Sequence, residues 1–248
     1  MSLIITIHTN EGILMASDSR TTFNKQDFSP LPDGKGAIIT DWQGIHYSDT
    51  TYKTFLAPNN AGISTCGAAA INGIPVTGFI EDFLHSKINA ETKVSDMPAL
   101  IMNEFRSYKP VPDIIFHVAG YEMVDGIPTQ RFYRVFVSIE KAIEVDTRAQ
   151  GAAWNGETEI LARLVNPYWT ESKSEDGTVT YNKHNAPPIP WNFFSLQDAI
   201  DFATFAIKTT IETMRFQERL KTVGGPIDIL TIKPTGATWI SRKELHVN

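Results

Sequence analysis

The sequence predicts an α+β fold, a four-layer αββα sandwich of two antiparallel sheets. Strand-like and helical runs come in blocks: strands, two helices, strands, two helices, strands. A parallel sheet would instead alternate strand and helix throughout. The first two strand runs are joined by Asn10-Glu11-Gly12, a turn typical of an antiparallel hairpin. The length suits one domain, residues 1–248, with inserts at about 21–44 and 166–191.

The amino-terminal part predicts strands at 3–9, 12–17, 52–56 and 62–66. Residues 21–44 between them are rich in Pro, Gly, Asp and Asn, and we expect a long loop there. Gly67-Ala-Ala-Ala-Ile is expected to open a helix, because four apolar residues recur at helical spacing: Phe79, Ile80, Phe83 and Leu84.

A second helix is predicted at 97–108, with capping residues just before Pro98. Four strands should follow at 114–121, 130–138, 142–146 and 148–152, then a short helix at 156–164 and the polar insert. Ser195-Leu-Gln-Asp198 resembles a capping box and predicts a long helix from 196 to about 219. Gly224-Gly225-Pro226 ends that region, and strands are expected at 227–232 and 238–241.

Composition narrows the classes of partner. There are 22 basic and 28 acidic residues, a net charge of −6, without a basic run, so neither nucleic acid nor a membrane is an expected partner. A single cysteine, Cys66, fits a reducing compartment. The apolar run 3–7 is too short for a leader segment, and we expect a cytoplasmic protein.

Several motifs agree with one family in order and spacing. They are Gly12-Ile-Leu-Met-Ala-Ser-Asp-Ser-Arg20, a lysine (Lys53) fourteen residues before Gly67, and Gly224-Gly-Pro-Ile-Asp near the end. Counting back sixteen residues from Asp18 reaches Ser2. The chain thereby resembles the proteasome β-type family of N-terminal-nucleophile hydrolases, including bacterial proteasome-like rings. It departs from the pattern in having serine as first residue and degraded supporting motifs, with Gly151-Ala-Ala and Lys221-Thr-Val-Gly-Gly in their places.

The resemblance implies a threonine-type peptidase or amidohydrolase in which Ser2, after removal of Met1, is the nucleophile. Its own α-amine would be the base. Lys53 would lower the pKa of that amine, Asp18 would orient Lys53, and the N–H of Gly67 would donate to the oxyanion. Arg20 would support Asp18. The implied substrate-binding residues are Thr21, Thr22, Thr51, Phe55, Thr65, Ala69 and Gly73.

Other interpretations remain open for each residue. Asp18 is also suited to cap a turn, Lys53 to be a solvated strand residue, and Cys66 to be core packing. The six histidines lack metal-ligand spacing, and we expect no metal or cofactor. The resemblance implies a homo-oligomer, such as a ring, and a peptide or amide substrate. It leaves open whether an ATP-dependent unfoldase docks, and whether the chain is instead a non-catalytic subunit for assembly or binding.

Overall fold

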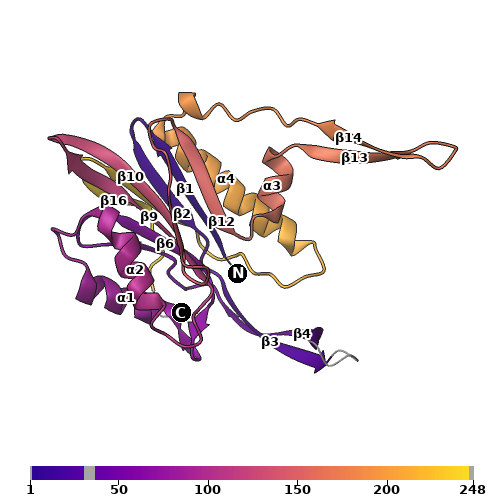
Figure 1. Cartoon of the computed structure of the whole chain (residues 1–248), viewed down its shortest axis with the longest axis horizontal. Coiled ribbons are helices and arrows are strands. Elements are labelled where there is room, and N and C mark those ends of the chain that lie inside the picture. The colour runs from indigo at the N-terminus through magenta and orange to yellow at the C-terminus, as the bar shows by residue number, and fades with distance from the viewer. Residues whose placement is uncertain (1, 31–36, 246–248) are drawn as a thin grey trace.

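Two five-stranded antiparallel sheets form the body of the molecule (Figure 1). The computed structural model describes residues 2–30 and 37–245. One sheet has the order β12 (Gly151–Gly156), β1 (Leu3–Thr9), β2 (Gly12–Ser17), β15 (Asp228–Lys233), β16 (Gly236–Ser241). The other has the order β11 (Lys141–Glu144), β10 (Ile127–Phe136), β9 (Ile114–Val124), β6 (Gly62–Gly67), β5 (Thr54–Leu56).

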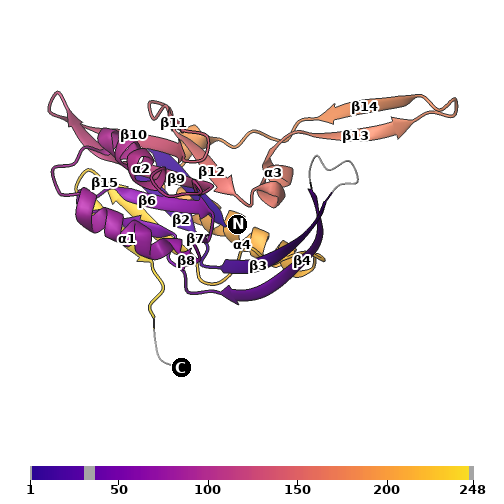
Figure 2. The same ribbon diagram turned by 60° about the horizontal axis from the view of Figure 1, so that its bottom comes forward.

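Three further two-stranded hairpins occur in the described ranges. They pair β3 (Thr21–Pro30) with β4 (Ala37–Ser48), β7 (Ala70–Ile71) with β8 (Ile74–Pro75), and β13 (Tyr168–Lys173) with β14 (Val179–His184). Figure 2 shows the first and last of these reaching out from the same end of the body. The α-helices of this part of the chain are α1 (Val76–Lys87), α2 (Met97–Phe105), α3 (Glu159–Val165) and α4 (Leu196–Arg215).

The helices pack on both sides of the paired sheets (Figure 1). Alternation along β2 shows how the faces divide: Leu14 and Ala16 join the cluster that contains α4, while Ile13 and Met15 join a cluster with Phe132 of the other sheet. A third cluster holds α1 and α2 against β6 and β9. Both faces of β1 and β2 are therefore buried, which explains their continuous apolar sequences.

The mixed α+β class is confirmed, and the predicted strands 3–9 and 12–17 are found at those bounds. The capping box of α4 is also confirmed: Ser195 and the Asp198 side chain each bind the other residue's backbone N–H. None of the helices in the described part of the chain is both long and apolar enough to cross a bilayer.

Two local predictions are wrong. The expected loop at 21–44 is mostly the paired hairpin β3–β4, with residues 31–36 outside the described residues. Gly67 does not open a helix, because Asn72 and Gly73 adopt positive φ and turn the chain into β7–β8 before α1 begins at Val76. The polar insert expected at 166–191 contains the hairpin β13–β14.

Candidate active site

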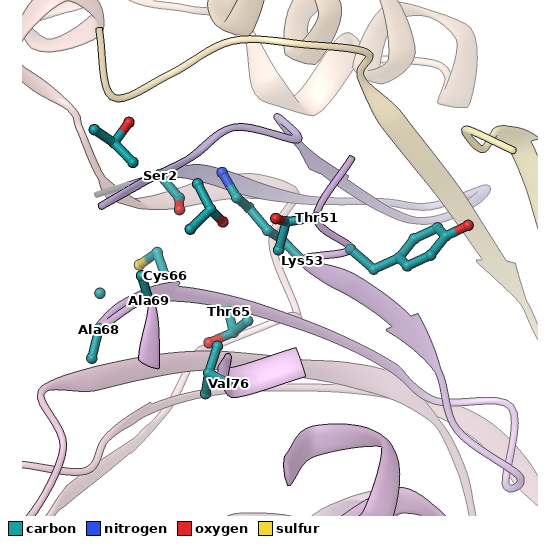
Figure 3. Close-up of a pocket in the computed structure, with 12 residues that line it drawn as sticks. Ser2, Thr51, Lys53, Thr65, Cys66, Ala68, Ala69 and Val76 are labelled. Atoms are coloured by element: carbon teal, nitrogen blue, oxygen red, sulfur yellow. The ribbon is translucent and has the colours of Figure 1, made fainter. Parts of the chain in front are cut away.

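A small pocket lies at the amino-terminal end of β1 (Figure 3). It brings together segments that are far apart in the sequence: the start of β1, the start of β3, the segment before β5 and the end of β6. Its lining residues are Ser2, Thr21, Thr22, Thr51, Tyr52, Lys53, Thr65, Cys66, Gly67, Ala68, Ala69 and Val76. Eight of them are predicted catalytic, oxyanion-hole or substrate-binding residues. Lys53 is the charged residue among these lining residues, and its side chain runs toward Ser2 in Figure 3.

Asp18 lies directly behind the pocket and is fully buried. In the β1–β2 register Ile4 faces Ser17, so Asp18 comes back to the start of β1. Its Oδ1 accepts from the N–H of Leu3 at 3.0 Å and from Lys53 Nζ at 2.8 Å. Its Oδ2 accepts from two more backbone N–H groups, those of Arg20 at 3.1 Å and Gly224 at 3.0 Å. Four donors therefore fix one carboxylate beside Ser2.

Lys53 is an almost fully buried cation. Its ammonium binds Asp18 and also donates to the carbonyl of Arg20. Its backbone carbonyl accepts from the N–H of Thr65 at 2.8 Å, which ties the segment before β5 to β6. Burial lowers the pKa of Lys53, and the attraction of Asp18 opposes that effect.

The main chain of Ser2 is held from two sides. The N–H of the next residue binds Asp18, and the Ser2 carbonyl accepts from the N–H of Glu157 at 2.7 Å. Gly156, at φ +96°, makes that approach possible, since a Cβ there would lie 1.7 Å from the Ser2 oxygen. Ser2 itself is only 8% exposed. Met1 lies outside the described residues.

Glu157 is a site residue that sequence reasoning missed. Its side chain is 5% exposed and accepts from Arg219 at 2.6 Å and from Thr222 at 3.3 Å. Gly151-Ala-Ala, which stands in the place of a supporting motif, begins away from Ser2, since Gly151 pairs with His8 at the far end of β12. Gly156, the last residue of β12, was the available signal, because a glycine in a strand can mark a site where another backbone approaches closely.

Gly67 ends β6 at the rim of the pocket and has φ +112°. A Cβ there would lie 2.2 Å from the carbonyl oxygen of Asp113. The fold therefore requires glycine at this position whether or not its N–H takes part in catalysis. The adjacent Cys66 is 4% exposed, and burial raises its pKa to about 12. A thiol with that pKa is a poor source of thiolate, which is consistent with packing.

Arg20 contacts Asp18 through its backbone N–H only. Its guanidinium makes two bonds to Asp49, of 2.6 and 2.7 Å. Gly224 lies directly against that guanidinium and Gly225 against Asp49, where a Cβ on either glycine would come within 3.0 Å. The Gly-Gly pair thus allows the chain before β15 to close over the Arg20–Asp49 ion pair and to reach Asp18.

Two predicted substrate-binding residues are not part of the pocket lining. Phe55 is 6% exposed and belongs to the core cluster under α1 and α2. Gly73 lies in the β7–β8 turn, and a Cβ there would meet nothing within 4 Å. The described residues also contain no group of three or more His, Cys, Asp or Glu side chains placed to hold a metal ion.

The arrangement places a hydroxyl, a buried ammonium and a fixed carboxylate next to one another. Such a set can activate a nucleophile if a proton acceptor is within reach of the hydroxyl. The amine of Ser2 would be that acceptor once the bond to Met1 is cut.

Neither a protein-family model nor a curated protein sequence matches this chain. Its fold is similar to that of solved Anbu (ancestral beta-subunit) proteins. For Anbu from Yersinia bercovieri the TM-score is 0.59 at 14% identity, covering 98% of this chain and 88% of the other. For a mutant of Anbu from Hyphomicrobium sp. strain MC1 the TM-score is 0.55 at 14% identity, covering 97% and 88%. A second structure of that Hyphomicrobium protein gives 0.52 at 14% identity, covering 98% and 88%.

These findings correct the assignment to the proteasome β-type family. The structural neighbours are Anbu proteins, which are proteasome-like but form a distinct family. The strands in the described ranges are also divided among five sheets, where two sheets were expected. At 14% identity the likeness establishes the fold alone.

Proposed function

We propose that this protein is a proteasome-related amidohydrolase, with a peptide or amide substrate, whose nucleophile is the hydroxyl of Ser2 after removal of Met1. The observation that carries the proposal is the convergence of Ser2, Lys53 and Asp18 at one pocket. We also propose the four-layer αββα sandwich as the arrangement of the body and a homo-oligomer as its assembly.

In the proposed reaction Ser2 Oγ attacks the carbonyl carbon of the bound amide. The α-amine of Ser2 takes the hydroxyl proton, and the tetrahedral intermediate collapses to an ester with loss of the amine product. Water then hydrolyses the ester. The Lys53 ammonium would lower the pKa of the α-amine, because two cations at close range repel, and so keep the amine a base near neutral pH.

Asp18 would keep Lys53 in place rather than take part in proton transfer. Its second oxygen is already occupied by two backbone N–H groups. The N–H of Gly67 would donate to the developing oxyanion. An extended substrate would pair with the backbone around Thr22 at the start of β3, as strand addition does elsewhere.

A second candidate is a non-catalytic subunit that acts in assembly or binding. The degraded supporting motifs favour it, because Gly151-Ala-Ala and Lys221-Thr-Val-Gly-Gly stand in their places. The two candidates differ in whether an electrophile can reach the Ser2 amine and hydroxyl together.

The test combines intact mass with labelling by a peptide epoxyketone, which captures an amino-terminal hydroxyl amine. Catalysis requires loss of Met1 and an adduct that disappears in Ser2→Ala and in Lys53→Met. Cys66→Ser is the matched control, since it removes the thiol from the lining of the same pocket and should keep the adduct. A chain that has lost Met1 but takes up no label would support the non-catalytic candidate.

A further inference from the structure

A second buried Lys–Asp pair lies next to the first one and has no part in the proposed reaction. Lys243 follows β16, and its ammonium binds Asp228 Oδ2. Its backbone N–H donates to Asp228 Oδ1 at 2.9 Å. Asp228 is fully buried and Lys243 is 9% exposed. Buried ion pairs often contribute little net stability compared with apolar side chains, so another role has to be considered.

This pair contacts the backbone neighbours of both Lys53 and Asp18. Asp228 faces Ser17, the residue before Asp18, in the β15–β2 register. The Lys243 ammonium lies 4.4 Å from the ring centre of Tyr52, the residue before Lys53. The Tyr52 hydroxyl in turn donates to the Lys243 carbonyl at 3.3 Å. The second pair is thus in contact with the pocket wall through Tyr52.

We propose that Lys243 and Asp228 form a positioning pair, which holds Tyr52 at the pocket wall and sets the charge state of Lys53. This inference rests on the proposed function, because the proposed reaction depends on a charged Lys53 beside the α-amine of Ser2. Neither residue is assigned a contact with substrate.

The charged surroundings of the pair support the proposal. Lys53 interacts with Asp18, Lys243 and the Cys66 thiol; burial lowers its pKa most, Asp18 raises it, and Lys243 lowers it further. Lys243 interacts with Asp228, Asp18 and Arg242; burial again lowers its pKa most, and Asp228 raises it. The Arg242 guanidinium is held over the rings of Tyr52 and Trp239, at 5.2 and 4.8 Å.

Removing Lys243 or Asp228 one at a time should shift the pKa of Lys53 in opposite directions. In Lys243→Met, Asp228 remains as an unpaired buried anion, which favours a cation at Lys53 and raises its pKa. In Asp228→Asn, Lys243 remains without its carboxylate, which lowers the pKa of Lys53. The double variant should return close to the parent. If the pair had only a structural role, both single variants would shift the pKa of Lys53 in the same direction.

The experiment follows the Lys53 side-chain ¹³Cε resonance with pH in the full chain, in a Ser2→Ala background so that no turnover is needed. Lys53→Arg assigns the resonance. We expect shifts of the titration midpoint of opposite sign in the two single variants, each of at least half a pH unit. Lys233→Met is the matched control, because Lys233 is an exposed lysine at the end of β15.

Shifts of the same sign, or no shift in either variant, would overturn the proposal. If Lys243→Met does not fold, Lys243→Gln keeps a hydrogen-bond donor without the charge and is held to the same outcome. The two proposals fail separately. An absent epoxyketone adduct at Ser2 with opposite Lys53 shifts rejects the proposed reaction alone, and an adduct without those shifts rejects the positioning pair alone.

Discussion

The backbone N–H of Glu157 donates to the carbonyl oxygen of Ser2 at 2.7 Å. The residue before Glu157 is Gly156, and a side chain at that position would clash with the Ser2 carbonyl. This bond ties the end of β12 to the start of β1. Together with the bond from the Leu3 N–H to Asp18, it fixes the main chain on both sides of Ser2. The position of the Ser2 hydroxyl therefore depends on two strands that flank it.

Gly156→Ala should displace Ser2. The new Cβ would meet the Ser2 carbonyl at 1.7 Å, in addition to the cost of a positive φ. We expect Tm to fall by roughly 6 °C or more, since 1 kcal/mol corresponds to roughly 2–4 °C at this chain length. Epoxyketone labelling should be lost in parallel.

Gly126→Ala is the control for that variant. Gly126 has a similar φ of +80°, but a Cβ there would meet nothing within 4 Å. It should therefore show only the conformational cost, about 1 kcal/mol, and keep the label. Equal effects of the two substitutions would mean that the contact with Ser2 is unimportant.

Asp18 and Lys53 should be strongly coupled in stability. Asp18→Asn leaves a buried ammonium without its counter-charge, and Lys53→Met leaves a buried carboxylate with one donor fewer. Each should cost roughly 3–5 kcal/mol. The double variant should lose less than the sum of the two by roughly 2 kcal/mol, because neither charge is then left alone. Urea unfolding of the four chains measures this, and strict additivity would contradict it.

Strands and helices with a buried face were predictable from the sequence. Strands β1 and β2 have a continuous apolar pattern, and α4 begins at a capping box, so local signals and tertiary burial agree. Hairpins β3–β4 and β13–β14 were not predicted, because β13 and β14 are exposed along their whole length and β3 is a mostly polar sequence that leads into a glycine- and proline-rich stretch. Without a buried face, strands have no hydrophobic alternation to detect.

The site was predictable only where a spacing pattern exists. Ser2, Lys53 and Thr65 could be placed because their motifs keep a fixed spacing along the chain. Glu157 and Lys243 could not, since each acts through a contact that depends on how distant strands meet. Phe55 was assigned to the pocket from the family resemblance, but it belongs to the core cluster under α1.

The arm β13–β14 should carry a contact between copies of this chain in the proposed homo-oligomer. Trp169 and Tyr181 lie on one face of this hairpin, and both are exposed, at 59% and 68%. Trp169→Ser combined with Tyr181→Ser should lower the mass measured by light scattering without unfolding the chain, because neither side chain is buried within one copy. Met123→Ser, at the exposed tip of β9, is the control. An unchanged mass would argue against the arm as an interface.

Acid should destabilise the fold through His117. The imidazole is fully buried between the sheets, where it binds Thr6 and Asn155 at 2.9 Å, and burial lowers its pKa to about 3. Below about pH 6.5 the unfolded chain takes up a proton that the folded chain refuses until about pH 3, so stability falls with pH across that window. The slope from this group should approach 1.4 kcal/mol per pH unit.

Urea unfolding from pH 7 to pH 4 should show a shallower loss of stability in His117→Gln than in the parent. His85→Gln, on the exposed face of α1, should follow the parent. Identical slopes in all three chains would exclude His117 as the cause.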